Sequence, residues 1–131
     1  MSLVLASDHA CVDRGLVPLS IKVHHLECLI LATFLGRARG LLFRECMLER
    51  CAVALLPCRA VHTFGMHGAI DLAFLDVRGV VLEIHELLQP MRVLRARFKS
   101  TVTTLELAAG QLSARRIKEG DQCILREGTM T

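Results

Sequence analysis

The densest group of chemically reactive side chains in this sequence of 131 residues lies between positions 58 and 71. The group consists of Cys58, His62, Met66, His67 and Asp71. Cys and His are the usual ligands of zinc, so Cys58, His62 and His67 are the candidate metal ligands. If residues 61–67 are extended, however, their side chains alternate, and His62 and His67 lie on opposite faces. The spacing therefore favours core packing for Cys58 and a hydrogen-bonded role for His62, and no cofactor is expected.

Nucleophilic catalysis would use the same residues. Cys58 and His62 form the one local pair of a nucleophile and a base, which thiol chemistry requires. The chain has no G-x-S-x-G sequence, and its segment 65–68 precedes a strand, whereas a phosphate-binding loop opens a helix. The sequence therefore favours a protein that is not an enzyme. A metal- or thiol-dependent enzyme built on Cys58, His62 and His67 remains the alternative.

Asp71 is the most informative charged residue, because a carboxylate within an apolar strand is costly unless it is paired. An arginine is the natural partner, and Arg37 or Arg44 could supply it. One interpretation is an internal salt bridge that fixes a helix on the sheet. The other is a pocket with one polar end. In that pocket the ligand-binding residues would be Arg37, Arg44, His62, Met66 and Asp71.

The clearest local pattern is a β-hairpin over residues 70–85. Every second residue from Ile70 to Phe74 is large and apolar, and the alternation resumes from Val80 to Ile84. Between these runs, Asp76 opens a four-residue turn and Gly79 closes it, which is a typical turn composition.

Further short elements flank this hairpin. Strands are predicted over Pro18–Leu31, Cys51–Leu56, Met91–Phe98, Thr101–Leu107 and Gln122–Arg126, and short helices over Phe34–Arg39 and Gln111–Arg116. Many short strands with few helices indicate a mainly β protein. We expect a single-domain β-sandwich or barrel of jelly-roll-like character with one or two short helices. Residues 1–15 are expected to form a loose arm, and residues 16–127 the domain.

Composition sets limits on function. With 53% apolar residues, the chain can bury a core, which excludes disorder. Its longest apolar runs are shorter than the roughly 18 residues that a membrane-spanning helix needs. A net charge of +3 and scattered arginines do not require a polyanionic partner. We therefore expect no nucleic-acid binding and no membrane span.

The six cysteines show no C-x-x-C spacing and no dense disulfide pattern. The first ten residues lack the basic segment that begins a signal peptide. Reduced thiols in a cytoplasmic protein are therefore the default expectation, with most cysteines acting as small buried apolar residues. A start codon chosen too late would hide an export signal, so an exported or periplasmic protein is the alternative.

Several separated motifs resemble one known family. They are Arg37-x-x-Gly40-Leu41-Leu42-x-Arg44, Pro57-Cys58-Arg59-x-Val61-His62-Thr63-Phe64-Gly65-Met66, Ile70-Asp71-Leu72-x-Phe74-Leu75-Asp76-x-x-Gly79, Leu105-Glu106-Leu107-x-Ala109-Gly110 and Gly120-Asp121. In this order they resemble the bacterial domain-of-unknown-function family one-nine-two, from about Ser20 to Leu125. The resemblance implies a small jelly-roll-like β-sandwich without an established function. It also implies relatives that are often exported or lipid-anchored and some that accompany pilus-assembly or secretion genes.

One departure from the family pattern concerns the segment before Asp71. Relatives read Met-Arg-Phe-Pro-Ile-Asp, whereas this chain reads Met66-His67-Gly68-Ala69-Ile70-Asp71. A basic residue, an aromatic residue and a proline are thus replaced, so a site lined by them would be altered here. Together these observations predict a non-enzymatic accessory module that binds a small molecule, a peptide or an envelope protein, with an undetermined oligomeric state.

Overall fold

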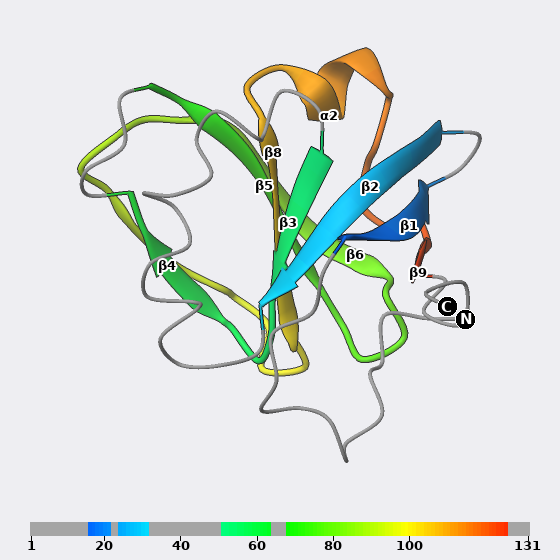
Figure 1. The fold of residues 1–131 in the computed structure, drawn as a ribbon. Coiled ribbons are helices and arrows are strands. Elements are labelled where there is room, and N and C mark those ends of the chain that lie inside the picture. Colours follow the sequence, from blue (N-terminus) through cyan, green and yellow to red (C-terminus); the bar gives the residue numbers. More distant parts are fainter. Residues whose placement is uncertain (1–15, 22–23, 32–50, 64–67, 126–131) are drawn as a thin grey trace.

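The computed structural model describes residues 16–21, 24–31, 51–63 and 68–125. This part contains nine strands and one short helix (Figure 1). They are β1 (Leu16–Ile21), β2 (His24–Leu31), β3 (Cys51–Leu55), β4 (Ala60–His62), β5 (Ile70–Leu75), β6 (Val81–Leu88), β7 (Val93–Arg95), β8 (Thr103–Ala108), α2 (Gln111–Ala114) and β9 (Cys123–Leu125). The expected mainly β, single-domain fold is confirmed.

Seven strands form one sheet in the order β6-β5-β8-β3-β2-β1-β9, and β4 pairs with β7 in a second sheet. Neighbouring strands are antiparallel except β2 and β3, which are parallel. The large sheet curls until its two edges meet at one isolated bridge between Val80 and Gln122. Of the two architectures expected, the barrel is not formed: in the described residues no sheet is closed.

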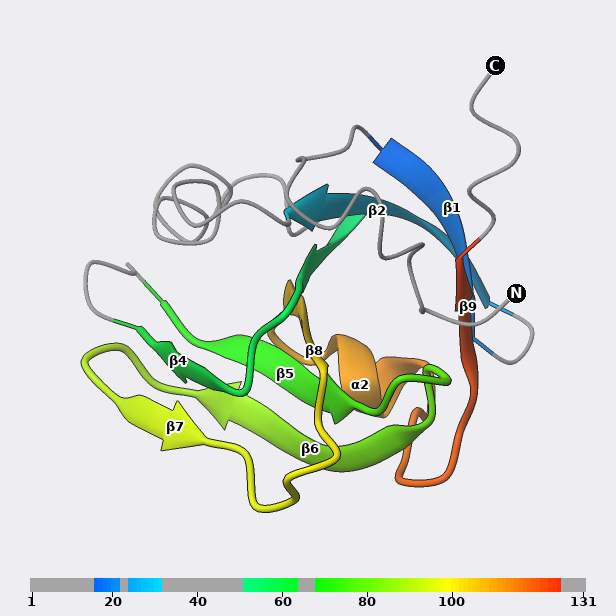
Figure 2. The same ribbon diagram turned by 90° about the horizontal axis from the view of Figure 1, so that it is seen from below.

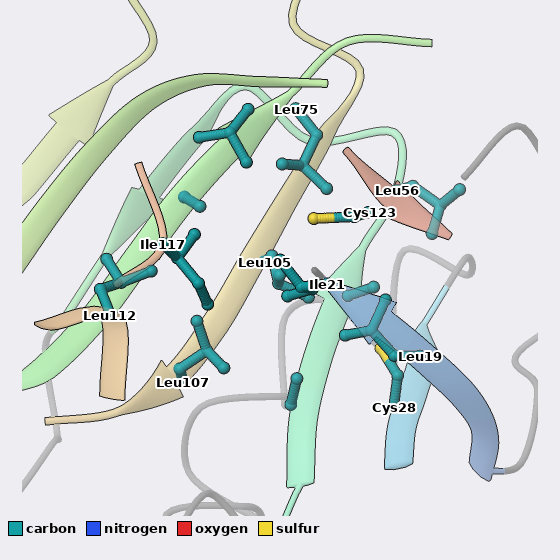
Figure 3. Packing of buried hydrophobic residues seen from close by; sticks show 14 residues of the cluster. Leu19, Ile21, Cys28, Leu56, Leu75, Leu105, Leu107, Leu112, Ile117 and Cys123 are labelled. Atoms are coloured by element: carbon teal, nitrogen blue, oxygen red, sulfur yellow. The ribbon is translucent and has the colours of Figure 1, made fainter. Parts of the chain in front are cut away.

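Strand β5 lies between two cores, which explains why all six of its residues are buried. Its alternation sends Ile70, Leu72 and Phe74 toward one apolar cluster and Ala73 and Leu75 toward another. Figure 3 shows the second cluster, which the curled sheet encloses together with α2. A strand with both faces covered is expected to be apolar on both, and Asp71 is the one residue of β5 that departs from this pattern.

The two-stranded sheet covers the outer face of β5 and β3. Val61 of β4 belongs to the apolar cluster that contains Phe74, and Leu94 of β7 packs against this cluster. Figure 2 shows β4 and β7 beside β5 and β6, with β1, β2 and β9 on the other side of the molecule. The inward residues of this small sheet therefore bury the face of β5 that the curled sheet leaves open.

The predicted hairpin is present as β5 and β6. Its turn is held by the Asp76 carboxylate, whose Oδ1 accepts N–H bonds from Arg78 at 2.8 Å and Val80 at 3.0 Å. Gly79 has φ 83°, a left-handed conformation that glycine adopts at little cost. The turn residues identified from the sequence thus perform the expected tasks.

Other element boundaries differ from the prediction. The stretch Pro18–Leu31 is two antiparallel strands, β1 and β2, because alternation alone does not distinguish one long strand from a hairpin. The strand expected over Met91–Phe98 is only three residues long. The helix expected over Gln111–Arg116 ends at Ala114. The helix predicted over Phe34–Arg39 and the arm over residues 1–15 lie outside the described residues.

Candidate functional site

The residues predicted to form a ligand-binding site occupy different places. Arg37, Arg44, Met66 and His67 lie outside the described residues. His62 is exposed on β4, whereas Asp71 is fully buried on β5. Asp71 shares its strand face with Ala73 and Leu75, which point away from the small sheet that carries His62. The structure therefore does not bring Asp71 and His62 together.

Two backbone groups, both donors, satisfy the Asp71 carboxylate. Its Oδ1 accepts from the Leu87 N–H at 2.9 Å, and its Oδ2 accepts from the Leu112 N–H at 2.8 Å. Leu112 lies in the first turn of α2, where N–H groups have no partner within the helix. Asp71 therefore fixes a helix on the sheet through peptide groups. An additional pairing with Arg37 or Arg44 stays a prediction.

The candidate metal ligands also do not converge in the described part of the chain. No group of three or more His, Cys, Asp or Glu side chains with metal-binding geometry occurs among those residues. Cys58 packs against the cluster that contains Val61. His62 follows Val61 in β4, so its side chain points to the opposite, exposed side of the strand. The Cys58 thiol donates to the carbonyl of Ala60 at 3.2 Å. His67 lies outside the described residues, so its role stays a prediction.

A shallow surface cavity of about 460 Å³, open to solvent, lies beside Cys58. It is formed by two chain segments. One is the connection between β3 and β4, and the other is the pair of residues immediately before β8. Its lining residues are Pro57, Cys58, Arg59, Ala60, Thr101 and Val102. Figure 1 shows these two connections meeting at one end of the large sheet. The cavity is therefore a product of chain segments about forty residues apart.

Backbone hydrogen bonds hold the two walls of this cavity together. The Cys58 N–H donates to the carbonyl of Val102 at 2.8 Å, and the Val102 N–H donates to the carbonyl of Leu75 at 2.8 Å. The hydroxyl of Thr104 donates to the carbonyl of Cys58 at 3.0 Å. The cavity walls are thus anchored to β5 and β8, and their positions do not depend on side-chain packing alone.

Three polar side chains line the cavity. Arg59 is exposed, and its Nη1 donates to the carbonyl of Lys99 at 3.1 Å. Thr101 is 2% exposed, and its hydroxyl oxygen has no hydrogen-bond partner among the described residues. Cys58 is half-buried and contributes a thiol. This set offers a cation, a hydroxyl and a nucleophile in one place.

A second buried carboxylate supports the strand next to the small sheet. Glu83 of β6 is 5% exposed. Its Oε2 accepts from the Arg97 N–H at 2.6 Å, and its Oε1 lies 3.3 Å from Nε2 of His85. The His85 ring in turn meets the Phe74 ring edge-on at 5.8 Å. Glu83 therefore positions the chain that follows β7, close to Lys99.

Sequence reasoning singled out Cys58 but not Arg59 or Thr101. Arg59 was visible as part of the motif Pro57-Cys58-Arg59, which carried the family resemblance. Thr101 gave no signal, because an ordinary threonine at the start of a strand is typical of β structure. Only the pairing of the two segments brings these residues to one cavity.

The comparisons with known proteins agree with the fold. The model of the family DUF192, described as "Uncharacterized ACR", matches residues 17–125. The chain belongs to this family. The resemblance to family one-nine-two is thereby confirmed. No curated protein matches this DUF192 chain.

Two crystal structures are similar to this DUF192 protein. One is a protein of unknown function from Novosphingobium aromaticivorans, with a TM-score of 0.74, 20% identity, and coverage of 92% of this chain and 98% of that one. The other is a "putative transcription regulator" from Sinorhizobium meliloti, with a TM-score of 0.76, 18% identity, and coverage of 87% and 96%. At these identities the likeness shows the fold alone.

The function of this DUF192 domain is not defined by its family or by these neighbours. In the described residues, no helix is long and apolar enough to cross a membrane. The cavity beside Cys58 is therefore the feature of the molecule from which a function can be argued.

Proposed function

We propose that this protein is a non-enzymatic binding module that holds a small molecule in the cavity between residues 57–60 and 101–102. The observation that carries the proposal is the Thr101 hydroxyl, which is buried beside the cavity and has no hydrogen-bond partner in the described part of the chain. A buried hydroxyl without a partner is costly. The oxygen itself has almost no exposed surface, so a ligand that bonds to it, and removes that cost, has to displace part of the cavity wall.

The size and composition of the cavity also support binding of a small molecule. Its volume of about 460 Å³ falls within the range of roughly 300–1,000 Å³ that is common for ligand pockets. Pro57, Ala60 and Val102 provide apolar contact area, while Arg59 and Thr101 provide polar contacts. Such a mixture of apolar walls and a few polar groups is typical of specific pockets.

The cavity in this proposal is a different site from the one predicted from the sequence around Arg37, Arg44, His62, Met66 and Asp71. Asp71 is occupied by two backbone N–H groups, so its carboxylate is a support for the fold. The accessory role in the cell envelope, in pilus assembly or in secretion, which the family resemblance implies, remains part of the proposal. It specifies where a natural ligand or partner is to be sought.

The test is a screen of small molecules by thermal unfolding, followed by two matched variants. Thr103 is also buried with a hydroxyl that has no partner in the described residues, but it does not line the cavity. Thr101→Val and Thr103→Val therefore make the same chemical change at a cavity and a non-cavity position. We expect compounds that raise Tm for the wild type and Thr103→Val to lose most of this effect on Thr101→Val.

A further variant detects ligands that bind in the cavity without a hydrogen bond to the Thr101 hydroxyl. Ala60→Phe adds a ring at the exposed end of the cavity wall, so it should exclude compounds whatever their polar contacts. Compounds that stabilise Thr101→Val and Ala60→Phe as much as the wild type bind elsewhere. That result would contradict the proposal.

A thiol-dependent enzyme is the competing function, and the position of Cys58 on the cavity wall is the observation that favours it. Two measurements distinguish an enzyme from a binding module: analysis of whether a bound compound is converted to a product, and the metal content of the purified protein. Conversion of the compound that stops in Cys58→Ala, with binding retained, would identify an enzyme. Stoichiometric zinc that is lost in Cys58→Ser or His62→Ala would identify the metal-dependent form. Binding without conversion and without metal is the outcome that the binding module predicts.

A further inference from the structure

We infer that the cavity beside Cys58 selects small organic anions, with Arg59 as the residue that determines this specificity. The inference rests on the proposed function and adds the chemical class of the ligand. Among the lining residues that the structure describes, Arg59 is the one charged side chain, and none is acidic.

Arg59 is held in place by its own hydrogen bond. One guanidinium nitrogen, Nη1, donates to the carbonyl of Lys99 at 3.1 Å across the two walls of the cavity. A guanidinium carries several further N–H donors in a planar arrangement that matches a carboxylate or phosphate group. The bond to Lys99 therefore limits the freedom of the side chain while leaving donors for an anion.

The surroundings of Arg59 add positive charge. Arg95 lies across from Ala60 in the β4–β7 register, and Arg97 and Lys99 follow on the same segment. All three side chains are exposed. Glu83, an acidic residue bonded to the Arg97 N–H and to His85, is buried. Exposed charges within about 10 Å of one another still interact at physiological salt, so this edge of the small sheet attracts anions.

The buried hydroxyl completes the site. The Thr101 hydroxyl has no partner among the described residues and almost no exposed surface, so it can donate to an anionic oxygen once the cavity wall shifts on binding. Hydrogen bonds to a charged group are stronger than those between neutral groups. An anion bonded by Arg59 and Thr101 together would therefore gain more than a neutral ligand of the same shape.

Cys58 provides a direct chemical reporter of this charge selectivity, because its half-buried thiol lines the same cavity. Iodoacetate and iodoacetamide alkylate thiols by the same displacement of iodide, and they differ mainly in charge. The measurement is the rate of alkylation of Cys58 by iodoacetate divided by its rate with iodoacetamide, followed by peptide mass spectrometry. This ratio is normalised to the same ratio for 2-mercaptoethanol, a free thiol without charged groups. In the wild type this normalised ratio should exceed one.

Arg59→Gln is the decisive variant, because it removes the charge and keeps a polar side chain. We expect the normalised ratio to fall roughly three- to fivefold, which corresponds to one charge a few ångströms from the reacting group in a high-dielectric environment. Added salt should reduce the wild-type ratio in the same direction. Inorganic phosphate and acetate, tested as competitors, should slow alkylation in the wild type, and their relative strength distinguishes a phosphate from a carboxylate ligand.

Arg115→Gln is the matched control. Arg115 follows α2, and β8 runs for six residues between the cavity and that helix. At about 3.3 Å for each strand residue, the control charge is roughly 20 Å from the cavity, beyond the screening length. Its removal should leave the ratio unchanged.

Three outcomes would overturn the inference: an equal ratio in the wild type and Arg59→Gln, a wild-type ratio no higher than that of 2-mercaptoethanol, or a Cys58 that reacts with neither reagent. Failure of the proposed function gives a different result. If neutral compounds bind with the expected dependence on Thr101 while the alkylation ratio is insensitive to Arg59, the binding module stands and only the anion selectivity is wrong.

Discussion

Asp71 shows how a single charged residue can serve the fold from inside an apolar strand. The bulge in β6 and the first turn of α2 each leave a backbone N–H without a partner in regular structure. The two carboxylate oxygens of Asp71 accept these two N–H groups, from Leu87 and Leu112. Because Gly110, the residue before α2, has no side chain to cap the helix, Asp71 supplies the acceptor from the neighbouring strand.

We predict that Asp71→Asn lowers the free energy of unfolding by about 2–3 kcal/mol, since one acceptor oxygen becomes an amide that cannot accept a bond from a buried N–H. Urea unfolding of the purified variant measures this loss. The exposed Glu119→Gln removes a carboxylate without buried partners and should change stability by less than about 0.5 kcal/mol. A loss of that small size for Asp71→Asn would contradict the assigned role.

Cys123 gives a second prediction, on the effect of alkaline pH. Burial, reinforced by the nearby Asp121 charge, raises the pKa of the Cys123 thiol from its ordinary value of 9.0 to about 12. Above pH 9 the unfolded chain loses this proton while the folded chain keeps it, so stability falls as the pH rises toward 12. The slope from this group approaches about 1.4 kcal/mol per pH unit.

Unfolding free energies of the wild type and Cys123→Ala, measured at about pH 8 and at about pH 10.5, isolate this effect. The variant has its own baseline at the lower pH, because a buried group is removed. We expect its stability to fall less steeply with pH than that of the wild type. Parallel pH profiles would show that Cys123 is not the group responsible.

Among the elements, β6 departs most from a regular strand. Its register with β5 shifts between the Ile70 and Leu72 pairs, where two residues of β6 face one of β5. Leu87 in this bulge has φ 54°, a left-handed conformation that is unfavourable for leucine, and its side chain is 55% exposed. The bulge directs the Leu87 N–H toward Asp71, so this unfavourable conformation allows the hydrogen bond between the Leu87 N–H and the Asp71 carboxylate.

We predict that Leu87→Gly raises the free energy of unfolding by about 0.5–1 kcal/mol, because glycine adopts this conformation freely and little buried contact is lost. Leu88→Gly is the comparison, since Leu88 has no left-handed φ and packs against the core beside Phe74. That variant should destabilise the protein in the same urea titration. Destabilisation by both would mean that the left-handed conformation carries no measurable strain.

For the molecule as a whole, the decisive feature is the meeting of the two edges of the large sheet. The Val81 N–H donates to the carbonyl of Asp121 at 2.8 Å, and the Cys123 N–H donates to the carbonyl of Gly79 at 2.9 Å. These bonds tie the start of β6 to the start of β9 without closing the sheet, and cluster residues from both edges lie in one core (Figure 3). An edge joined in this way offers fewer unpaired groups to another chain.

Amide hydrogen exchange tests this junction. The amides of Val81 and Cys123 should exchange much more slowly than those of the exposed loop around Lys99, because opening them requires separation of the two edges. The amide of Leu105 in the central strand β8 sets the scale for full protection. Exchange at Val81 and Cys123 as fast as in the loop would show that the edges do not hold together in solution.

The sequence by itself determined the mainly β class and the hairpin at residues 70–85, because alternation, Asp76 and Gly79 act over a few residues. It also identified Asp71 as a carboxylate in need of partners. It did not identify those partners, since peptide N–H groups are the same in every sequence and only the bulge and the helix bring them to Asp71.

The tertiary structure alone decided where a ligand could bind. Arg59 and Lys99 are forty residues apart, and no local pattern links them or marks Thr101 as a cavity residue. The antiparallel pairing of β3 with β8 sets the walls against each other, because one wall follows β3 and the other precedes β8. The spacing of nearby residues specifies turns and strand faces. A cavity depends instead on which strands pair across the whole sheet. This pairing is determined by the simultaneous burial of both apolar cores.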